Sequence, residues 1–285
     1  MKRIATIGFF DGVHKGHQFL FEHLRMLASE RGLTPLIVTM DTHPRMVLQS
    51  DYLPKLLTSL EERKVLLAQY GEVVVMPFVE VQPLTAEQFM QRLHDEYAVS
   101  VLLMGYDHRF GSDRLERPQD YRRIGEQCGV EVITMPEYTE GEWHVSSTEI
   151  RQALETGNIM VANELLGHPY ALRGTVVHGK GLGRTIGFPT ANIKPSDPYK
   201  IIPQCGVYMA RVDTPMMDNA PTFVNIDVQG IIEAHIPSFK GDLYGAQLEL
   251  RFERFLREER SFPTLEHLKE QIKDDVDSIL RQGEH

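Results

Sequence analysis

Apolar residues in the first half of the chain alternate between short β-type runs and segments with helical spacing. The first run covers residues 4–10 and the second covers 35–40. Between them, Gly32 is a typical helix stop, and apolar side chains recur every three or four positions at Leu20, Leu24, Leu27 and Ala28. The pattern predicts a strand–helix–strand unit at the start of the chain.

The same alternation continues to about residue 155. Ser59-Leu60-Glu61-Glu62 and Thr85-Ala86-Glu87-Gln88 have the form of capping boxes and predict helices that end near Gly71 and Tyr97. A later helix is expected to begin at Ser146. A further helix is expected over 118–127, and strands are expected over 72–78, 99–104 and 130–135. Strands that alternate with helices predict an α/β domain with a doubly wound parallel sheet.

The pattern changes near Gly167. Residues 152–167 are expected to form one or two short helices broken near Gly157, and strands then follow one another without helices between them. These strands are expected over 172–178, 207–212, 222–228, 231–236 and 244–255. They predict an antiparallel sheet or small β-barrel, followed by an amphipathic helix over 265–280. We therefore expect two domains, residues 1–167 and 168–285.

Composition narrows the class of protein. Of the 285 residues, 42% are apolar and 25% charged, which is typical of a soluble globular protein. No apolar run approaches the roughly 20 residues that span a bilayer, so we expect no membrane partner. The net charge of -10 argues against nucleic-acid binding. Cys128 and Cys205 are far apart and lack metal-ligand spacing, so we expect free thiols and a cytoplasmic location.

The turn after the first strand carries candidate chemistry. It reads Phe9-Phe10-Asp11-Gly12-Val13-His14-Lys15-Gly16-His17 and opens the first helix. A helix N-terminus presents free N–H groups that favour an anion, and glycine lets a ligand approach the backbone. His14 and His17 can donate hydrogen bonds to phosphate oxygens. The alternative interpretation is a polar turn with two solvated histidines.

The spacing His-x-Gly-His is similar to that of nucleotidyltransferases, which hold an ATP triphosphate during attack at the α-phosphorus. Together with Gly8, the turn resembles the N-terminal signature of bacterial bifunctional riboflavin kinase/FAD synthetases. The resemblance implies a catalytic role for His14 and His17. It also implies nucleotide contacts from the residues around them, namely Gly8, Phe9, Asp11, Gly12 and Gly16.

A loop expected after the 99–104 strand resembles another part of the FAD synthetase module. It reads Gly105-Tyr106-Asp107-His108-Arg109-Phe110-Gly111, and the resemblance implies flavin contacts from Asp107 and Phe110. The chain departs from the family in having His108 where phenylalanine is usual, and in lacking a Gly-Arg-x-Gly segment just beyond. Without the resemblance, this segment is equally an ordinary loop.

Ser146-Ser147-Thr148-Glu149-Ile150-Arg151 matches a Ser-Ser-Thr-x-Ile-Arg motif of the same module. The simpler interpretation is a helix cap, for which serine followed three residues later by glutamate suffices. The resemblance implies that Ser147 and Thr148 bind phosphate and that Arg151 stabilises the charge developing on the departing pyrophosphate.

The second half carries the most specific motif, a glycine-rich run from Gly179 that ends in Gly187-Phe188-Pro189-Thr190-Ala191-Asn192. It strongly resembles the riboflavin kinase motif, the alternative being a barrel turn with incidental glycines. Backbone N–H groups of such a run can wrap phosphates, which implicates Gly179, Lys180, Gly181, Gly183 and Arg184. Thr190 and Asn192 offer oxygen ligands suited to Mg²⁺.

Glu233 is the candidate base. Strand alternation places Glu233 and His235 on the face opposite Ile232, Ala234 and Ile236. An acid on a barrel strand can simply be solvated. The kinase family, however, has a Glu-x-His element here, whose glutamate accepts the proton of the ribityl 5′-hydroxyl. The chain departs from the family just before it, because residues 225–230 form a shortened loop that lacks Pro-Thr.

The resemblance implies a bifunctional enzyme of flavin-cofactor synthesis. It would phosphorylate riboflavin to FMN with MgATP and then join FMN to AMP from a second ATP, giving FAD and pyrophosphate. Two other interpretations stay open: another small-molecule adenylyltransferase, and a flavin- or nucleotide-binding protein with one degenerate site. A tRNA synthetase is disfavoured because no Lys-Met-Ser-Lys-Ser loop is present.

Overall fold

A computed structural model describes residues 1–49, 51–140, 143–179, 183, 187–260, 264, 266, 267, 269–271 and 273. The chain forms two compact units, Met1–Ser147 and Thr148–His285. Within the described ranges, no helix has the length and apolar character needed to cross a bilayer.

The first unit is built on a parallel sheet. Its described strands have the order β3-β2-β1-β4-β5, so the chain moves outward from β1 in one direction and then in the other. The strands are β1 (Arg3–Ile7), β2 (Thr34–Met40), β3 (Glu72–Met76), β4 (Val99–Met104) and β5 (Glu131–Thr134). All four pairings between neighbours are parallel, which confirms the expected doubly wound sheet.

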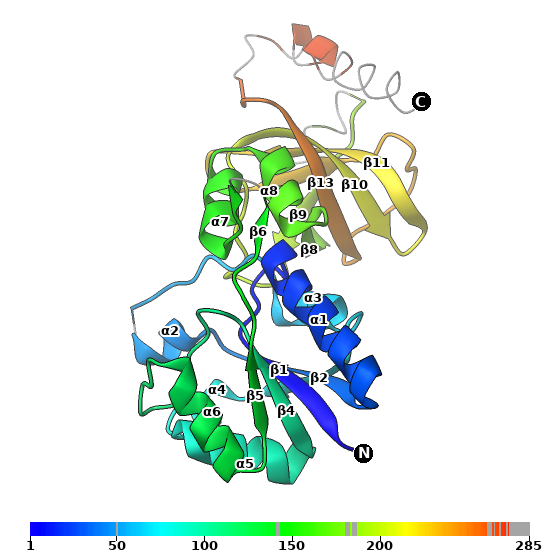
Figure 1. Cartoon of the computed structure of the whole chain (residues 1–285). Helices are drawn as coiled ribbons and strands as arrows, with labels where there is room; N and C mark the ends of the chain where they lie inside the picture. Colours follow the sequence, from blue (N-terminus) through cyan, green and yellow to red (C-terminus); the bar gives the residue numbers. More distant parts are fainter. Residues whose placement is uncertain are drawn as a thin grey trace. The chain divides into compact units, whose positions relative to one another are not determined.

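Helices cover both faces of this sheet (Figure 1). Helices α1 (Lys15–Arg31) and α3 (Leu60–Leu67) pack on one face, where Phe21, Leu24 and Leu67 meet Ile4 and Ile37. On the other face, α5 (Ala86–Tyr97) and α6 (Pro118–Gln127) bury a second cluster around Phe89, Leu93 and Tyr121. Because both faces are buried, the sheet offers ligands only its edges and strand ends.

The second unit starts with two helices and continues as a barrel (Figure 1). Helix α7 (Ser147–Glu155) begins at the last residue of the first unit, and α8 (Ile159–Leu166) follows after Gly157, whose φ of 72° ends the preceding helix. The described strands close into an antiparallel barrel in the order β10-β11-β12-β9-β8-β13. They are β8 (Tyr170–Val177), β9 (Ala191–Pro195), β10 (Gly206–Thr214), β11 (Met217–Ile226), β12 (Ile232–His235) and β13 (Gln247–Arg257). Beyond the barrel, residues 266, 267, 269–271 and 273 are helical, and the rest of the helix expected over 265–280 lies outside the described residues.

The structure adds short elements that the sequence pattern did not predict. These are α2 (Pro44–Leu48), α4 (Phe78–Val81), a hairpin of β6 (Thr139–Glu140) and β7 (Trp143–His144), and the barrel strand β9. Helix α3 ends at Leu67, and not near Gly71 as expected. Gly71 is needed for another reason, since a Cβ there would lie 2.8 Å from the Pro35 carbonyl oxygen.

Candidate active sites

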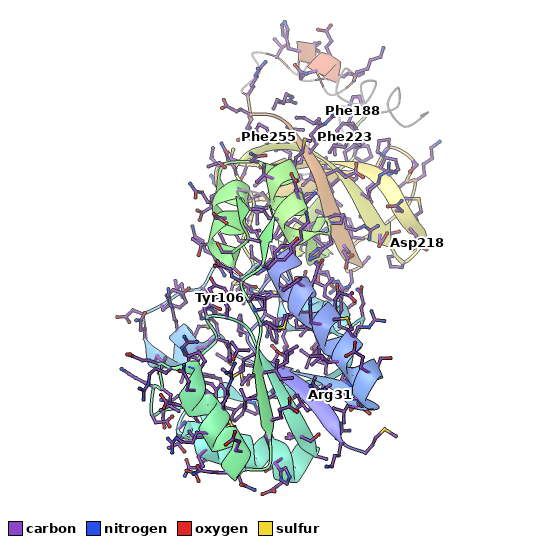
Figure 2. All side chains as sticks on the ribbon, viewed as in Figure 1. Arg31, Tyr106, Phe188, Asp218, Phe223 and Phe255 are labelled. Carbon is purple, nitrogen blue, oxygen red and sulfur yellow. The ribbon has the colours of Figure 1, made fainter. Side chains whose placement is uncertain are left out.

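The order of the strands places two of the candidate loops side by side. β1 pairs with both β2 and β4, and the chain reverses its direction of winding between β1 and β4. In open α/β sheets, ligands bind in the crevice at the carboxyl ends of the strands that flank such a reversal. The turn with His14 and His17 follows β1, and the loop that contains Tyr106 (Figure 2) follows β4.

The two histidines of the first turn form a stacked pair. The ring centroids of His14 and His17 are 3.6 Å apart at an interplanar angle of 17°, and the ring of Phe10 contacts His17 edge-on. Burial, with a smaller contribution from the charge of His14, holds the pKa of His17 well below its usual range. His17 is therefore neutral at pH 7. A neutral imidazole has one N–H donor.

The turn that carries the histidines has an unusual backbone. Phe10 and Val13 have positive φ angles of 55° and 45°, where most non-glycine residues are strained, and Gly12 has a φ of 82°. A Cβ on Gly16 would lie 3.3 Å from the ring of His14, so this glycine lets the pair and the helix approach closely. Strain of this kind persists only where the surroundings hold it in place.

Asp11 supplies much of that support. Its buried carboxylate accepts hydrogen bonds from the backbone N–H of Leu57 at 2.9 Å and of Thr58 at 3.0 Å. In return, Gly12 N–H donates to the Thr58 hydroxyl at 3.0 Å. The segment before α3 is thus clamped onto the turn, a contact between distant positions that sequence analysis missed.

The start of α7 contacts the same turn. Ser147 Oγ donates a hydrogen bond to the main-chain carbonyl of Asp11 at 3.0 Å. Ser147 is also the first residue of α7, and Thr148 and Arg151 follow within that helix. One of the three residues of this motif is thereby brought to the histidine turn.

A cavity of about 360 Å³ opens within the first unit. Its walls come from the ends of β1 and β2, from α2, α4 and α5, and from the loop after β4, including Gly8, Phe9, Phe78, Phe89, His108 and Phe110. Ligand pockets typically have volumes of about 300–1,000 Å³, apolar walls and a few polar groups. Of the two residues expected to contact flavin, Phe110 lines this cavity, whereas Asp107 is exposed and is not part of its wall.

Tyr121 of α6 fixes the loop that forms one wall. Its buried hydroxyl donates to the Phe110 carbonyl at 2.9 Å or to that of Leu115 at 3.0 Å, and it accepts from Phe110 N–H at 3.1 Å. Burial raises the pKa of Tyr121, which keeps the hydroxyl protonated. A tyrosine on the buried face of a helix was not predicted as part of a site, because its spacing is that of an ordinary core residue.

The second unit brings its candidate metal ligand and candidate base together. Glu233 on β12 pairs directly with Asn192 on β9 and with Asn225 on β11. Directly paired residues of an antiparallel sheet project on the same face, with Cβ atoms about 4.5–5.5 Å apart. Buried Ile232 and Ala234 flank half-buried Glu233, which confirms the expected alternation. Thr190 lies just before β9, two positions from Asn192.

His235 ties this motif to the base strand. Its Nδ1 lies 2.8 Å from the carbonyl oxygen of Pro189, and because a carbonyl can only accept, Nδ1 carries the proton. Phe188 contacts the same ring edge-on, with centroids 5.5 Å apart, and the ring of Phe223 lies 6.4 Å away. Thus His235, two residues from Glu233, holds the segment that carries Thr190.

Two glycines of the motif allow neighbouring polar groups to approach the backbone closely. A Cβ on Gly179 would lie 2.1 Å from the amide nitrogen of Asn192, and one on Gly183 would lie 2.3 Å from the Phe188 carbonyl oxygen. The oxygens of Thr190 and Asn192 are hard ligands of the kind that Mg²⁺ takes, so the residues present fit this metal. Lys180, Gly181 and Arg184 lie outside the described residues.

Comparison with known proteins gives one family for each half of the chain. Residues 1–149 match the family model of FAD synthetase, and residues 166–282 match that of riboflavin kinase. A crystal structure from Streptococcus pneumoniae, described as a macrolide-efflux protein, has a TM-score of 0.87 and 30% identity, covering 97% of this chain and 93% of that one.

Three relatives named bifunctional riboflavin kinase/FMN adenylyltransferase match over nearly the whole chain. The relative from Listeria monocytogenes is 34% identical, over 96% of this chain and 90% of the relative. The relative from Escherichia coli K12 is 35% identical, with 95% and 90% covered. That from Bacillus subtilis 168 is 34% identical, with 98% and 92% covered. The chain therefore belongs to the bifunctional riboflavin kinase/FMN adenylyltransferase family, with a FAD synthetase domain followed by a riboflavin kinase domain.

Proposed function

We propose that the two domains act in succession on one flavin. The kinase domain, residues 168–285, transfers the γ-phosphoryl group of ATP to the 5′-hydroxyl of riboflavin, giving FMN and ADP. The adenylyltransferase domain, residues 1–167, then joins FMN to the AMP portion of a second ATP and releases pyrophosphate. Family membership supports the pair of reactions, and ATP use together with two free thiols favours the cytoplasm.

The pairing of Glu233 with Asn192 is the observation that carries the kinase assignment. Phosphoryl transfer needs a positioned hydroxyl and compensation of phosphate charge more than covalent help from the protein. In this proposal Glu233 orients the ribityl hydroxyl and accepts its proton. Thr190 and Asn192 would hold Mg²⁺, which supplies charge neutralisation at the ATP phosphates when bound. The glycine-rich run from Gly179 to Arg184 would contact those phosphates through its backbone.

His14 and His17 carry the adenylylation. The FMN phosphate attacks the α-phosphorus of ATP directly, so no protein nucleophile is required. The stacked pair beside the N-terminus of α1 would bind the triphosphate, with Gly8, Phe9, Gly12 and Gly16 giving backbone access. Ser147, Thr148 and Arg151 would stabilise the departing pyrophosphate, and the Ser147–Asp11 hydrogen bond supports this role for the start of α7.

The apolar cavity is the proposed site of the isoalloxazine ring during adenylylation. The cavity lies between the end of β1 and the loop after β4, which supports a position of the ring next to the turn with the histidines. Phe9 and Phe110 would contact the faces or edges of the ring. Asp107, exposed at the same loop, would contact the more polar part of the flavin.

His235 gives a test of the geometry in the kinase domain. We expect His235→Ala to lower the rate of FMN formation by about 10- to 100-fold, because the segment with Thr190 is no longer held to the strand with Glu233. His235→Asn should retain most of the rate, since the asparagine Nδ2 can replace the imidazole Nδ1 as donor to Pro189. Steady-state kinase assays of both variants measure this. Equal loss in the two variants would contradict the assignment.

Tyr121 gives the corresponding test in the adenylyltransferase domain. Tyr121→Phe removes the hydroxyl that bonds the backbone of Phe110 and Leu115, so we expect a several-fold rise in KM for FMN, in line with about 1 kcal/mol per lost hydrogen bond. The rate of riboflavin phosphorylation should not change. An unaltered KM for FMN would show that the loop does not depend on this anchor.

Product analysis decides between the proposed function and its alternatives. The purified protein is incubated with riboflavin, Mg²⁺ and ATP, and the flavins are separated by chromatography. FMN followed by FAD supports the proposal. FAD formation only from supplied FMN, or FMN as the sole product, would indicate a single active site, and flavin binding without either product would indicate a regulator.

A further inference from the structure

We infer that His108 determines specificity in the adenylylation reaction, through a hydrogen bond between its Nε2 atom and the imide edge of the FMN ring system. The inference rests on the proposed function of the first domain and names a contact that the family pattern does not contain. Family members usually have phenylalanine where this chain has His108, and phenylalanine has no polar atom to offer.

The geometry places a buried polar atom in a largely apolar wall, which also contains Gln82, Arg109, Ser112 and Arg114. His108 lines the 360 Å³ cavity together with Phe9, Phe78, Phe89 and Phe110. Its Nε2 is buried, and within the described part of the chain it has no hydrogen-bond partner. A buried polar atom without a partner is costly to the folded protein, and such atoms are rare unless a ligand or water satisfies them.

The backbone of His108 is held in position by its own loop. The backbone N–H of His108 donates to the Gly105 carbonyl at 3.3 Å, and the Arg109 guanidinium donates to the His108 carbonyl at 2.8 Å. The ring of Phe110 lies 6.0 Å from that of His108. Because its backbone is bonded on both sides, His108 stays anchored at the cavity wall.

The uncharged state of His108 is suited to a hydrogen bond with an uncharged group of the ligand. Burial lowers the pKa of His108 to about 4, with Arg109 acting in the same direction and Asp107 in the opposite one. The imidazole is therefore uncharged at neutral pH, and Nε2 is a donor or an acceptor according to the tautomer. The imide edge of a flavin offers both partners, since an N–H donor stands between two carbonyl acceptors.

The test compares His108→Phe, which restores the usual family residue, with His108→Gln, whose side-chain amide reaches the position of Nε2. Adenylylation is assayed with FMN and with 3-methyl-FMN, in which a methyl group replaces the imide hydrogen. We expect His108→Phe to raise KM for FMN by about tenfold, as for one lost hydrogen bond, with kcat and KM for ATP unchanged. The glutamine variant should retain most of the wild-type affinity.

Discrimination between the two flavins is the decisive readout. The wild-type enzyme should prefer FMN over 3-methyl-FMN, and His108→Phe should lose most of that preference. The rate of riboflavin phosphorylation, measured on the same preparations, reports whether the variant is folded. An unchanged KM for FMN in His108→Phe, an equal preference in both proteins, or a change in KM for ATP in place of FMN would overturn the inference while leaving the proposed function intact. Failure of the wild-type protein to adenylylate FMN would overturn both.

Discussion

Replacing Glu233 with glutamine is expected to lower the rate of FMN formation by roughly 10²-fold or more, as for loss of a general base. Glutamine keeps the size and hydrogen-bonding shape of the side chain but cannot accept the proton of the ribityl hydroxyl. The strand pairing of Glu233 with Asn192 and Asn225 should survive, because it is made by the backbone. The loss should therefore appear in kcat for riboflavin phosphorylation, measured at saturating ATP.

Two controls separate chemistry from damage to the fold. Asp218→Asn makes the same carboxylate-to-amide change at an exposed position of β11 (Figure 2) and should leave the kinase rate unchanged. FAD formation from supplied FMN should stay near normal in Glu233→Gln, since it takes place in the other domain. If Glu233→Gln phosphorylates riboflavin at the wild-type rate, Glu233 is not the base.

Replacing His14 and His17 with alanine is expected to have the reverse effect. In the proposed function each substitution removes a hydrogen-bond donor to the triphosphate, and loss of one such preorganised donor typically costs about 10²–10³ in kcat. Because the rings are stacked, removal of one also leaves the other without its neighbour, so the two effects should not be additive. The measurement is the rate of FAD formation from FMN and ATP.

The matched control for the histidines is His94→Ala, which removes an exposed imidazole from α5 of the same unit. Its rate of FAD formation should equal that of the wild type. Riboflavin phosphorylation should continue in the His14 and His17 variants, so that FMN accumulates. Unchanged production of FAD in the double variant would remove the histidine pair from the adenylylation site.

Local patterns in the sequence predicted the helix ends that are determined by residues close to them in the sequence. The capping boxes at Ser59 and Thr85 are both formed, and Gly32 ends α1 with a φ of 62°. In each case the signal and the structure it specifies lie within a few residues. Strand β9 was missed because Ala191–Pro195 is short and is stabilised by pairing with β8 and β12, which lie elsewhere in the sequence.

In the candidate sites, too, local motifs were predicted from the sequence and contacts between distant segments were not. The motifs indicated His14, His17 and Glu233, whose residue types and spacing carry their chemistry. The sequence could not reveal the clamp of Leu57 and Thr58 on Asp11, because distant segments meet there. The same holds for the part of the cavity wall to which β1, β2, α2, α4 and α5 each contribute one or two apolar residues that look like ordinary core positions.

In the proposed function two ATP molecules are used in order, one in each domain. Labelled ATP tests it directly, with riboflavin as the starting flavin and separation of the products over time. Label from [γ-³²P]ATP should appear first in FMN and then in FAD, whereas label from [α-³²P]ATP should appear only in FAD. Transfer of α-label to FAD without earlier γ-label in FMN, or no labelled flavin at all, would contradict this order of reactions.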